Sequence, residues 1–447
     1  MLLKFQVANF RSLRDPATLS LYRAGKRPKG VAPEDWSDVS PIMAVFGSNA
    51  SGKSTLYEAL RTVQTAVRNS YTRWEPDSAV PVMPFLLDPD FITEPTEFSI
   101  EFRADDDLDY VYGFSCDQTR ILTEHLYVYK SAHRTVLFER GLGDDLDDIK
   151  FGPSFKGMKA ELKQAVQSRP NALTLSAGSQ MGASSQLTPA YHWITQKLHC
   201  YDAQQWEFEH LRVQDRLMHD PAFSQSMLMI LSKADLGIDG IEVKETELPP
   251  IPDGGGLVAR FNYTLSKNAE MRAERISGQL MSPVRRELIL SHKSPTGSTP
   301  FSMAYESQGT KSFIALVSKC LLALETGGTV IVDEIDSSLH SVLTAEIVSM
   351  FKSPTVNSRG AQLIFTTHDV ALLSKGSMEH PLLERDQIYL VEKDRKNASY
   401  LISLTEYKLR PDENIFRNYI LGRYGGLPSP SFLESALLGD FPQTAAP

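Results

Sequence analysis

The sequence predicts an α/β fold in which a mixed, mostly parallel central sheet accompanies a lobe of antiparallel strands. Three short, continuous apolar runs, at residues 42–46, 329–332 and 363–365, predict the central sheet. Strands that are buried on both faces, as in a parallel sheet covered by helices, have this composition. Alternation of apolar and polar residues over 3–7 and 17–21 predicts half-buried strands that begin the antiparallel lobe.

The middle of the chain continues this lobe. Residues 100–102, 110–116, 122–130 and 135–140 have the composition of short strands, and two acidic segments separate them. We interpret these acidic segments, 104–109 and 143–148, as solvated hairpin turns and not as metal sites.

The pattern becomes helical from about residue 158 to residue 235. Asp220 and Pro221 have the types preferred for a helix cap and first position, which predicts a helix through Ala234 that ends near Gly237. The glycine-rich segment 252–287, which carries mixed charges, is expected to be a mobile loop or lid. The last residues, 442–447, are expected to be disordered.

Composition excludes several classes of protein. The chain has 447 residues, a formal net charge of −9 and 42% hydrophobic residues, which are ordinary values for a globular protein. Its three cysteines lie far apart without a CxxC pair, which argues against a disulfide framework or a zinc ribbon and fits a reducing cytosol. No apolar run approaches ~18 residues, so no membrane span is predicted. The acidic balance argues against a general nucleic-acid coat but leaves room for a local basic groove.

A phosphate-binding loop follows the run at 42–46. The segment GSNASGKST places Gly47, Gly52, Lys53 and Ser54 in the GxxxxGK[ST] spacing, between a buried strand and a helix. Backbone N–H groups of such a loop face phosphates, and the helix adds its positive dipole end. Lys53 would reach the β- and γ-phosphates, and Ser54 would ligate Mg²⁺. The alternative is a glycine- and serine-rich turn with a lysine of no special role.

Two carboxylates follow the run at 329–332. Asp333 would hold Mg²⁺ through water, and Glu334 would activate the attacking water as general base. The alternative is that both merely cap the next helix. His368 follows the run at 363–365 and is interpreted as a γ-phosphate sensor or hydrogen-bond donor, with a structural histidine as the alternative. Because ligands bind beyond the carboxyl ends of parallel strands, we expect these clusters to meet in space.

A third anion-binding element is the turn at Ser307 and Gly309, which begins a helix just before the acidic pair. On its own this signal is weak, because many helix caps have the same sequence.

The order of these motifs is that of the ABC-type ATPases, which include chromosome-maintenance and recombination ATPases. Further segments, among them NFRSLRDPATLSL, PFLLDP, YESQGTKSF and ILGRYGGLP, resemble the AAA15-type, RloA-like ATPases of bacterial phage-defence and abortive-infection loci, which are related to OLD-type heads. The resemblance covers nearly the whole chain. It implies an ABC-type ATPase head with a P-loop core, an antiparallel N-terminal β-lobe and an inserted strand and helical region.

The resemblance also implies site residues. ATP would be sandwiched between two heads, so that the phosphate loop of one subunit faces the SQGT turn of another. Asp336 would lie in the D-loop, and Arg11 would approach the nucleotide. Gln180 is a candidate for the metal-binding Q-loop glutamine, with a polar loop residue as the alternative. The implied ATP-binding residues of the loop are Gly47, Ser48, Asn49, Ala50, Ser51, Gly52, Lys53, Ser54 and Thr55, and those of the facing turn are Ser307, Gln308 and Gly309.

Four segments are expected along the chain. Residues 1–67 and 291–447 would form the two halves of the ATPase head, 68–150 would complete the antiparallel lobe, and 151–290 would be a helical insertion or lid. Gln308 stands where the group often has an acidic residue, which could alter the dimer contact. Relatives with a fused nuclease carry it after the ATPase region, and we expect any nuclease here to be a separate chain.

The implied function is an ATP- and Mg²⁺-dependent switch in anti-phage defence. It would form a homodimer or larger oligomer, respond to a phage-derived trigger and control a separate effector, such as a toprim-like nuclease. One alternative is a DNA-repair or DNA-end-binding ATPase that acts directly on nucleic acid, for which salt-sensitive DNA binding is the discriminating observation. Another is a scaffold in which nucleotide binding matters more than turnover.

Overall fold

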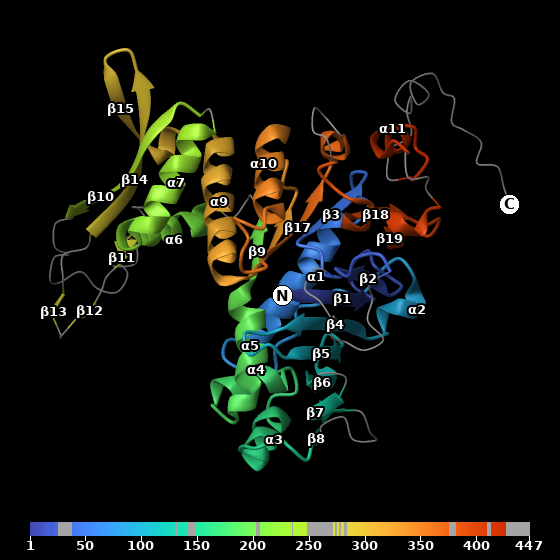
Figure 1. The fold of residues 1–447 in the computed structure, drawn as a ribbon. Helices are drawn as coiled ribbons and strands as arrows, with labels where there is room; N and C mark the ends of the chain where they lie inside the picture. The colour runs from blue at the N-terminus through green and yellow to red at the C-terminus, as the bar shows by residue number, and fades with distance from the viewer. Residues whose placement is uncertain are drawn as a thin grey trace. The chain divides into compact units, whose positions relative to one another are not determined.

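The computed structural model describes residues 1–25, 38–130, 133–141, 148–202, 206–234, 236–247, 271–272, 275–276, 279–280, 284–374, 381–408 and 413–425 (Figure 1). The chain divides into two compact units. Unit 1 comprises 1–200, 326–334 and 348–447, and unit 2 comprises 201–325 and 335–347. Each of the four expected segments is one continuous stretch of sequence, whereas each of these units is made of two or more separate stretches.

Unit 1 contains a six-stranded sheet in which the three continuous apolar runs are neighbours. β3 pairs in parallel with both β17 and β18, and β17 pairs in parallel with β16. Every residue of β3 and β17 is buried, as the composition of these runs predicts. The strand order is β19 (Ser399–Ser403), β18 (Ile388–Lys393), β3 (Ile42–Gly47), β17 (Gln362–Thr367), β16 (Thr329–Asp333) and β9 (Leu198–Asp202).

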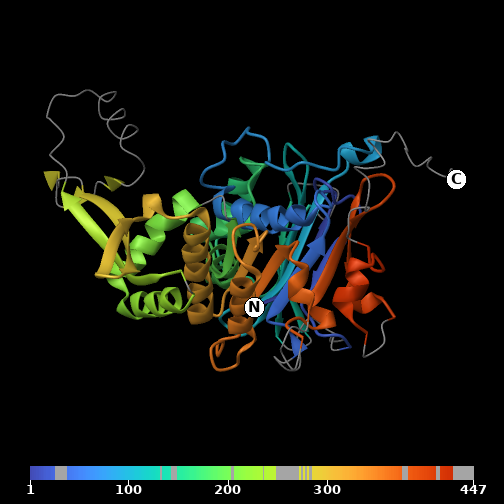
Figure 2. The same cartoon turned by 90° about the horizontal axis from the view of Figure 1, so that it is seen from above.

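Helix α1 (Lys53–Asn69) begins immediately after the phosphate loop and contacts β3, β16 and β17 (Figure 2). Its apolar residues recur at helical spacing and are buried, including Leu56, Leu60, Val63 and Val67. This packing holds the N-terminal end of the helix, and with it the phosphate loop, at the carboxyl end of β3.

The antiparallel lobe is a seven-stranded sheet in the same unit. Its strands follow the order β2 (Ala17–Ser20), β1 (Leu2–Ala8), β4 (Thr96–Arg103), β5 (Asp109–Cys116), β6 (Ile121–Lys130), β7 (His133–Arg140) and β8 (Ile149–Phe151). β1 alternates buried and half-buried residues after Leu3, as predicted. The acidic residues 105–107 are exposed in the turn between β4 and β5, which confirms that hairpin turn. Most of the second acidic segment, 142–147, lies outside the described residues.

Helices α3 (Lys159–Gln167), α4 (Thr174–Gln180) and α5 (Thr188–His192) complete unit 1 beside this lobe (Figure 1). Trp193, the residue that follows α5, stacks its ring on that of Phe102 in β4 with centroids 4.3 Å apart. A buried carboxylate, Glu124, accepts hydrogen bonds from the backbone N–H groups of Thr174 and Leu175 at the start of α4. Burial raises the pKa of Glu124.

The described C-terminal part of unit 1 contains the strand pair β18 and β19 and the helix α11 (Ile415–Ile420). The ring of Tyr419 on α11 packs edge-on against Phe46 at the end of β3, with centroids 6.0 Å apart. Short segments in this unit are α2 (Pro89–Ile92), η2 (Ser185–Leu187), η3 (Trp193–Lys197), η6 (Val370–Leu373), η7 (Arg385–Gln387) and η8 (Leu404–Glu406). The C-terminal residues 426–447, including the segment expected to be disordered, lie outside the described residues.

Unit 2 confirms the predicted helix cap. Helix α7 (Pro221–Lys233) begins after Asp220, whose Oδ1 accepts a hydrogen bond from the backbone N–H of Phe223 at 3.0 Å. The other elements are α6 (Trp206–His219), β10 (Ile238–Glu247), β11 (Met271–Arg272), β12 (Arg275–Ile276), β13 (Gln279–Leu280), β14 (Val284–Ser294), β15 (Gly297–Ser302), η5 (Met303–Tyr305), α9 (Gln308–Thr326) and the start of α10 (Ser341–Lys352).

The expected lid is only partly described. Residues 252–270 lie outside the described residues, and 284–287 are not loop but the first residues of β14, which pairs with β10. A strand forms there because 284–287 pairs with β10 and its first two residues also pair with β11, while β15 pairs further along, with 289–294. Within the described parts of the chain, no helix is both long and apolar enough to span a membrane.

Candidate phosphate-binding site

Unit 1 brings three distant segments to one edge of the six-stranded sheet. Because β3, β16 and β17 are parallel neighbours, the residues that follow each strand lie at the same edge. They surround a cleft of about 530 Å³. Its lining residues are Ser12, Asn49, Ala50, Ser51, Gly52, Lys53, Ser54, Thr55, Glu334 and His368. The predicted convergence of the phosphate loop, Glu334 and His368 therefore occurs within one unit.

Lys53 has its ammonium group at the mouth of the loop. Its Nζ donates hydrogen bonds to the carbonyl oxygens of Gly47 (2.8 Å) and Ser48 (2.9 Å), and it lies 3.3 Å from Nδ1 of His368. The side chain is almost fully buried. A buried cation that bonds to the carbonyl oxygens of its own loop is well placed to exchange these bonds for the oxygens of an anion.

His368 lies between the lysine and the carboxylate. Its Nε2 is 3.6 Å from Oε1 of Glu334, while its Nδ1 faces Lys53. The side chain of Glu334 is about half exposed at 49%, so water can reach it. The ammonium group of Lys53, the imidazole of His368 and the exposed carboxylate of Glu334 thus lie one after another along the cleft.

Thr366, on β17, organises the acidic pair and was not predicted from the sequence. Its hydroxyl donates to Oδ1 of Asp333 at 2.7 Å and accepts from the backbone N–H of Glu334 at 2.7 Å. The residue is buried. The only signal in the sequence was its place in TTHD directly after an apolar run, which does not distinguish it from other strand-end threonines.

The backbone is strained around this cleft. Six non-glycine residues among those described have positive φ, and three of them lie in or next to the loop and acidic pair: Arg11 (φ 50°), Ala50 (φ 60°) and Glu334 (φ 48°). Such conformations cost energy and persist where the surrounding structure enforces them, commonly at functional sites. Asn9 and Asn397, in the turns that flank the loop, are two more.

The glycines of the loop are required by close packing. A Cβ on Gly47 would lie 2.6 Å from both the hydroxyl of Ser51 and the carbonyl oxygen of Val391. Gly52 has φ of 110°, and a Cβ there would lie 2.6 Å from the hydroxyl of Ser12. Both positions of the motif therefore exclude a side chain for steric reasons, and Gly52 does so for its conformation as well.

The residues at hand fit a magnesium ion that is shared with phosphates. Ser54 is exposed at the cleft, and Asp333 supplies a single carboxylate oriented by Thr366. No group of three or more acidic, histidine or cysteine side chains able to hold a metal occurs among the described residues. Mg²⁺ is usually bound through one or two carboxylates together with substrate phosphates and water, so this donor set suits it.

Five predicted site residues of unit 1 are not among the lining residues of the cleft: Gly47, Ser48 and Asp333, which lie close to lining residues in the chain, and Arg11 and Gln180. Arg11 adjoins the lining residue Ser12, but its guanidinium pairs with Glu58 of α1 at 3.6 Å and its side chain is 46% exposed. Gln180 ends α4, and its Nε2 donates to the hydroxyl of Tyr191 at 2.6 Å. The structure does not bring Gln180 to the cleft, so it drops out of the proposed metal ligands.

The SQGT turn and Asp336 belong to unit 2. The hydroxyl of Ser307 accepts from the backbone N–H of Thr310 at 3.1 Å and so caps α9. Ser307 and Gln308 are exposed. A Cβ on Gly309 would lie 2.8 Å from the carbonyl oxygen of Ser338, two residues beyond Asp336. The signature turn and the D-loop segment are therefore packed together in this unit, and glycine allows their close approach.

Parallel strands and a GxxxxGK[ST] loop between the strand β3 and the helix α1 define the class of the α/β P-loop proteins. The model of the family described as "AAA domain, putative AbiEii toxin, Type IV TA system" matches residues 42–160 and 201–374, which is more than half of the chain. The chain belongs to this family of AAA-type ATPases. The matched ranges include the phosphate loop, the SQGT turn, the acidic pair and His368.

The chain is also similar to several solved structures. An SMC head bound to the C-terminal winged-helix domain of ScpA is 12% identical, with 90% of this chain and 96% of that chain covered and a TM-score of 0.40. The SMC head domain from Thermotoga maritima is 12% identical, with 90% and 98% covered and a TM-score of 0.38. The recombination mediator RecF bound to ATP is 16% identical, with 90% and 97% covered and a TM-score of 0.35. No curated protein matches the chain.

Proposed function

We propose that this protein binds and hydrolyses ATP with Mg²⁺ at the cleft of unit 1 and works as a nucleotide-gated switch. The observation that carries the proposal is the convergence of Lys53, His368 and Glu334, from three strand ends, on the lining of one cleft. Lys53 and the loop backbone supply phosphate binding, and Glu334 supplies a carboxylate open to water.

Each residue has a distinct task in this mechanism. Lys53 leaves the carbonyl oxygens of Gly47 and Ser48 and donates to the β- and γ-phosphates. His368 then donates to the γ-phosphate, and Glu334 accepts the proton of the attacking water. Ser54 and Asp333 would hold Mg²⁺, which neutralises the phosphate charge.

The switch would require a second copy of the chain. The resemblance to ABC-type ATPases implies that ATP is sandwiched between the loop of one subunit and Ser307, Gln308 and Gly309 of another, with Asp336 in the contact. The exposure of Ser307 and Gln308 supports this role, because a turn that meets a partner's nucleotide must be open to solvent in the free chain. The γ-phosphate would then join the two copies, and hydrolysis would release them.

The biological setting we propose is anti-phage defence. The family description names an abortive-infection toxin of a toxin–antitoxin system, and the sequence resembles ATPases of phage-defence loci. We therefore propose that ATP-driven assembly reports a phage-derived trigger to a separate effector protein, with a nuclease as the favoured kind.

The test is the variant Glu334→Gln, which keeps the shape of the side chain but removes its basicity. Because a positioned general base contributes roughly 10²–10⁴-fold, we expect ATP turnover to fall by at least about 100-fold while ATP binding is retained. The ATP-bound oligomer should persist on size-exclusion chromatography with light scattering. Glu161→Gln, an exposed residue on α3, is the matched control and should hydrolyse ATP at the wild-type rate.

Turnover of Glu334→Gln at the wild-type rate would contradict the assignment of the general base. Wild-type protein that binds ATP without hydrolysing it would point to a scaffold. Salt-sensitive DNA binding that stimulates hydrolysis, measured by filter binding, would favour the alternative of an ATPase acting directly on nucleic acid.

A further inference from the structure

The phosphate loop is held from outside its own motif by two serines. Ser12 lies in the turn between β1 and β2, and Ser399 is the first residue of β19. Neither belongs to the GxxxxGK[ST] segment, and they are separated by nearly the whole chain. Ser399 is buried, and Ser12 is half-buried in the lining of the cleft.

Hydrogen bonds join these serines to the loop and to each other. The hydroxyl of Ser399 donates to the carbonyl oxygen of Ser51 at 2.5 Å, and its backbone N–H donates to the carbonyl oxygen of Ser12 at 2.7 Å. The hydroxyls of Ser12 and Thr55 share a hydrogen bond of 2.9 Å. The loop is thus tied at Ser51, the residue before Gly52, and at Thr55, in the first turn of α1.

The two hydroxyls also occupy the space beside Gly52. A Cβ on Gly52 would overlap both the Ser12 and the Ser399 side chains. Gly52, with a φ of 110°, is the residue at which the loop turns into α1. The two serines pack directly against it. Their position therefore bears on the loop's conformation and not only on the stability of the strands that carry them.

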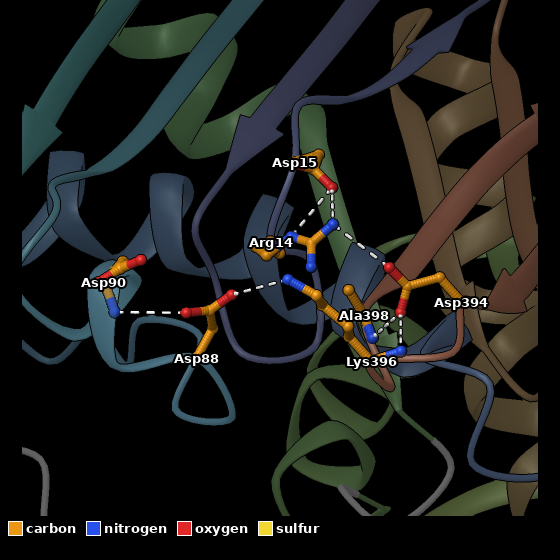
Figure 3. Close-up of polar contacts among 7 residues, drawn as sticks. All are labelled: Arg14, Asp15, Asp88, Asp90, Asp394, Lys396 and Ala398. Carbon is orange, nitrogen blue, oxygen red and sulfur yellow. Dashed lines mark hydrogen bonds and ion pairs between the residues drawn. The ribbon is translucent and has the colours of Figure 1, made fainter. Parts of the chain in front are cut away.

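An ion pair holds together the turns that carry the serines. Figure 3 shows Arg14 between Asp15 and Asp394. Its Nη2 lies 2.7 Å from Oδ2 of Asp15 and 3.2 Å from Oδ2 of Asp394. Arg14 follows Ser12 by two residues, and Asp394 lies in the turn that leads into Ser399. The Arg14 side chain is only 15% exposed, so the pair is partly shielded from solvent.

The turn between β18 and β19 is itself rigidly built. Oδ1 of Asp394 accepts hydrogen bonds from the backbone N–H groups of Lys396 (2.8 Å) and Ala398 (2.9 Å). Asn397 has a φ of 60°, a conformation that asparagine tolerates better than most residues. The backbone N–H of Ala398 and then that of Lys396, together with the charge of Arg14, hold the pKa of Asp394 below its usual value. The same contacts that lower the pKa thus join the carboxylate to the backbone of its own turn.

We propose that Ser399 and Ser12 are positioning residues that set the phosphate loop in its binding conformation before nucleotide arrives, and that the Arg14–Asp394 pair keeps their two turns together. This inference rests on the proposed function, because it concerns the loop that binds ATP. A loop already in its binding conformation loses less conformational freedom on binding phosphate, which raises affinity without any contact to the ligand.

The test is Ser399→Ala, with binding measured by isothermal titration calorimetry in the presence of Mg²⁺. The probes are ATPγS, an analogue that is hydrolysed only slowly, and inorganic tripolyphosphate, which has no base or sugar. Loss of a buried hydrogen bond is worth roughly one pKd unit, so we expect affinity for both probes to fall by the same factor, about tenfold. Ser12→Ala is a second variant, at a less buried position, and should lower both affinities in the same way.

The matched control is Ser403→Ala. Ser403 ends the same strand, β19, where its hydroxyl caps η8 by accepting from the backbone N–H of Thr405, and it is not among the residues lining the cleft. This variant removes a serine hydroxyl and a cap but should bind both probes as the wild type does. Equal losses in Ser403→Ala and Ser399→Ala would overturn the inference, since they would show a general effect on the strand.

The ion pair is tested by a double-mutant cycle between Arg14→Met and Ser399→Ala. We expect Arg14→Met alone to lower tripolyphosphate affinity about threefold, and the double variant to lose less than the product of the single losses, because both act through one arrangement. Strict multiplication of the losses would overturn the role of the pair.

The outcomes separate this inference from the proposed function. Wild-type protein that binds neither probe would overturn both. Wild-type protein that binds both probes, with Ser399→Ala and Ser12→Ala binding them equally well, would overturn only the inference. A loss confined to ATPγS would also overturn it, because the serines would then act on the nucleoside and not on the phosphate loop.

Discussion

The cleft of unit 1 and the SQGT turn of unit 2 both offer anion-binding groups, but they differ in how those groups are placed. In the cleft, the polar groups are paired with one another: Lys53 bonds to the loop and faces His368, which faces Glu334. In the turn, Ser307 and Gln308 are exposed, and the serine hydroxyl bonds only locally to Thr310.

This difference in placement indicates which of the two regions we expect to bind phosphate in a single copy of the chain. A concave site with a buried cation can bind phosphate without help, whereas an exposed cap at a helix start is a weak anion site unless another surface covers it. We therefore expect the cleft to determine binding and the turn to determine what binding does.

The largest expected effect comes from Lys53→Ala, which removes the cation of the cleft. Hydrogen bonds to charged groups are worth enough to predict a loss of ATPγS affinity of about 100-fold by calorimetry. Lys156→Ala, an exposed lysine elsewhere in unit 1, is the control and should bind normally. Comparable affinity in Lys53→Ala and the wild type would mean that the cleft is not the binding site.

The second effect concerns the turn. In Ser307→Arg a bulky cation replaces the exposed serine, and we expect ATPγS affinity of the single copy to stay within about threefold while turnover falls by about tenfold or more. The turn would then act in the second copy and not in binding. A loss of binding equal to that of Lys53→Ala would remove the distinction between the two regions.

Mixing variants sharpens this result. A mixed pair of Lys53→Ala and Ser307→Arg would contain one intact cleft facing one intact turn, so the mixture should regain part of the turnover that each variant lacks. A mixture of Lys53→Ala and Glu334→Gln has no intact cleft and should regain none. Equal activity of the two mixtures would contradict a site shared between two copies.

The smallest expected effect is on the melting temperature, from a substitution in unit 2 that should leave nucleotide binding unchanged. The backbone N–H of Phe223, and after it Arg216, hold the pKa of Asp220 below its usual value of 3.8. A carboxylate with a lowered pKa stabilises the fold above its usual pKa, and this contribution is lost as the pH falls through the lowered value. Asp220→Ala should lower the melting temperature at pH 7 by a few degrees, and the difference from the wild type should shrink below about pH 4.

Circular dichroism melts at several pH values measure this effect, and Asp220→Asn is the control because asparagine also caps helices well. ATPγS affinity should be unchanged in both variants. A drop in ATPγS affinity would contradict the expectation that the cleft of unit 1 determines nucleotide binding independently of this helix cap.

Much of the fold could be predicted because its signals are local. The run at 42–46 is apolar throughout because β3 is covered on both faces, and the loop after it is glycine-rich because Gly47 and Gly52 leave no room for a side chain. The cap at Asp220 needs only its own turn of helix. Such features depend on residues within a few positions, so the sequence displays them.

The features that could not be predicted depend instead on residues that are distant in the sequence. Nothing near Gln180 in the sequence shows that α4 lies beside the antiparallel lobe, where the side chain bonds to Tyr191. Thr366, Ser12 and Ser399 are common residues without a motif, and they matter only because of what lies against them. Residues 284–287 become a strand because β10 and β11 pair with this part of β14, and not because of a local preference.

The α/β class, the phosphate loop and the polar residues at each strand end can be recognised without a structure, since backbone conformation and burial follow from short-range patterns. In contrast, the position of β18 beside β3, the resulting contact of Ser399 with Ser51 and the bonds of Thr366 to the acidic pair follow from how distant segments pack. The reason is that a neighbour across a sheet is chosen by packing of the whole core, and no local run of residues records that choice.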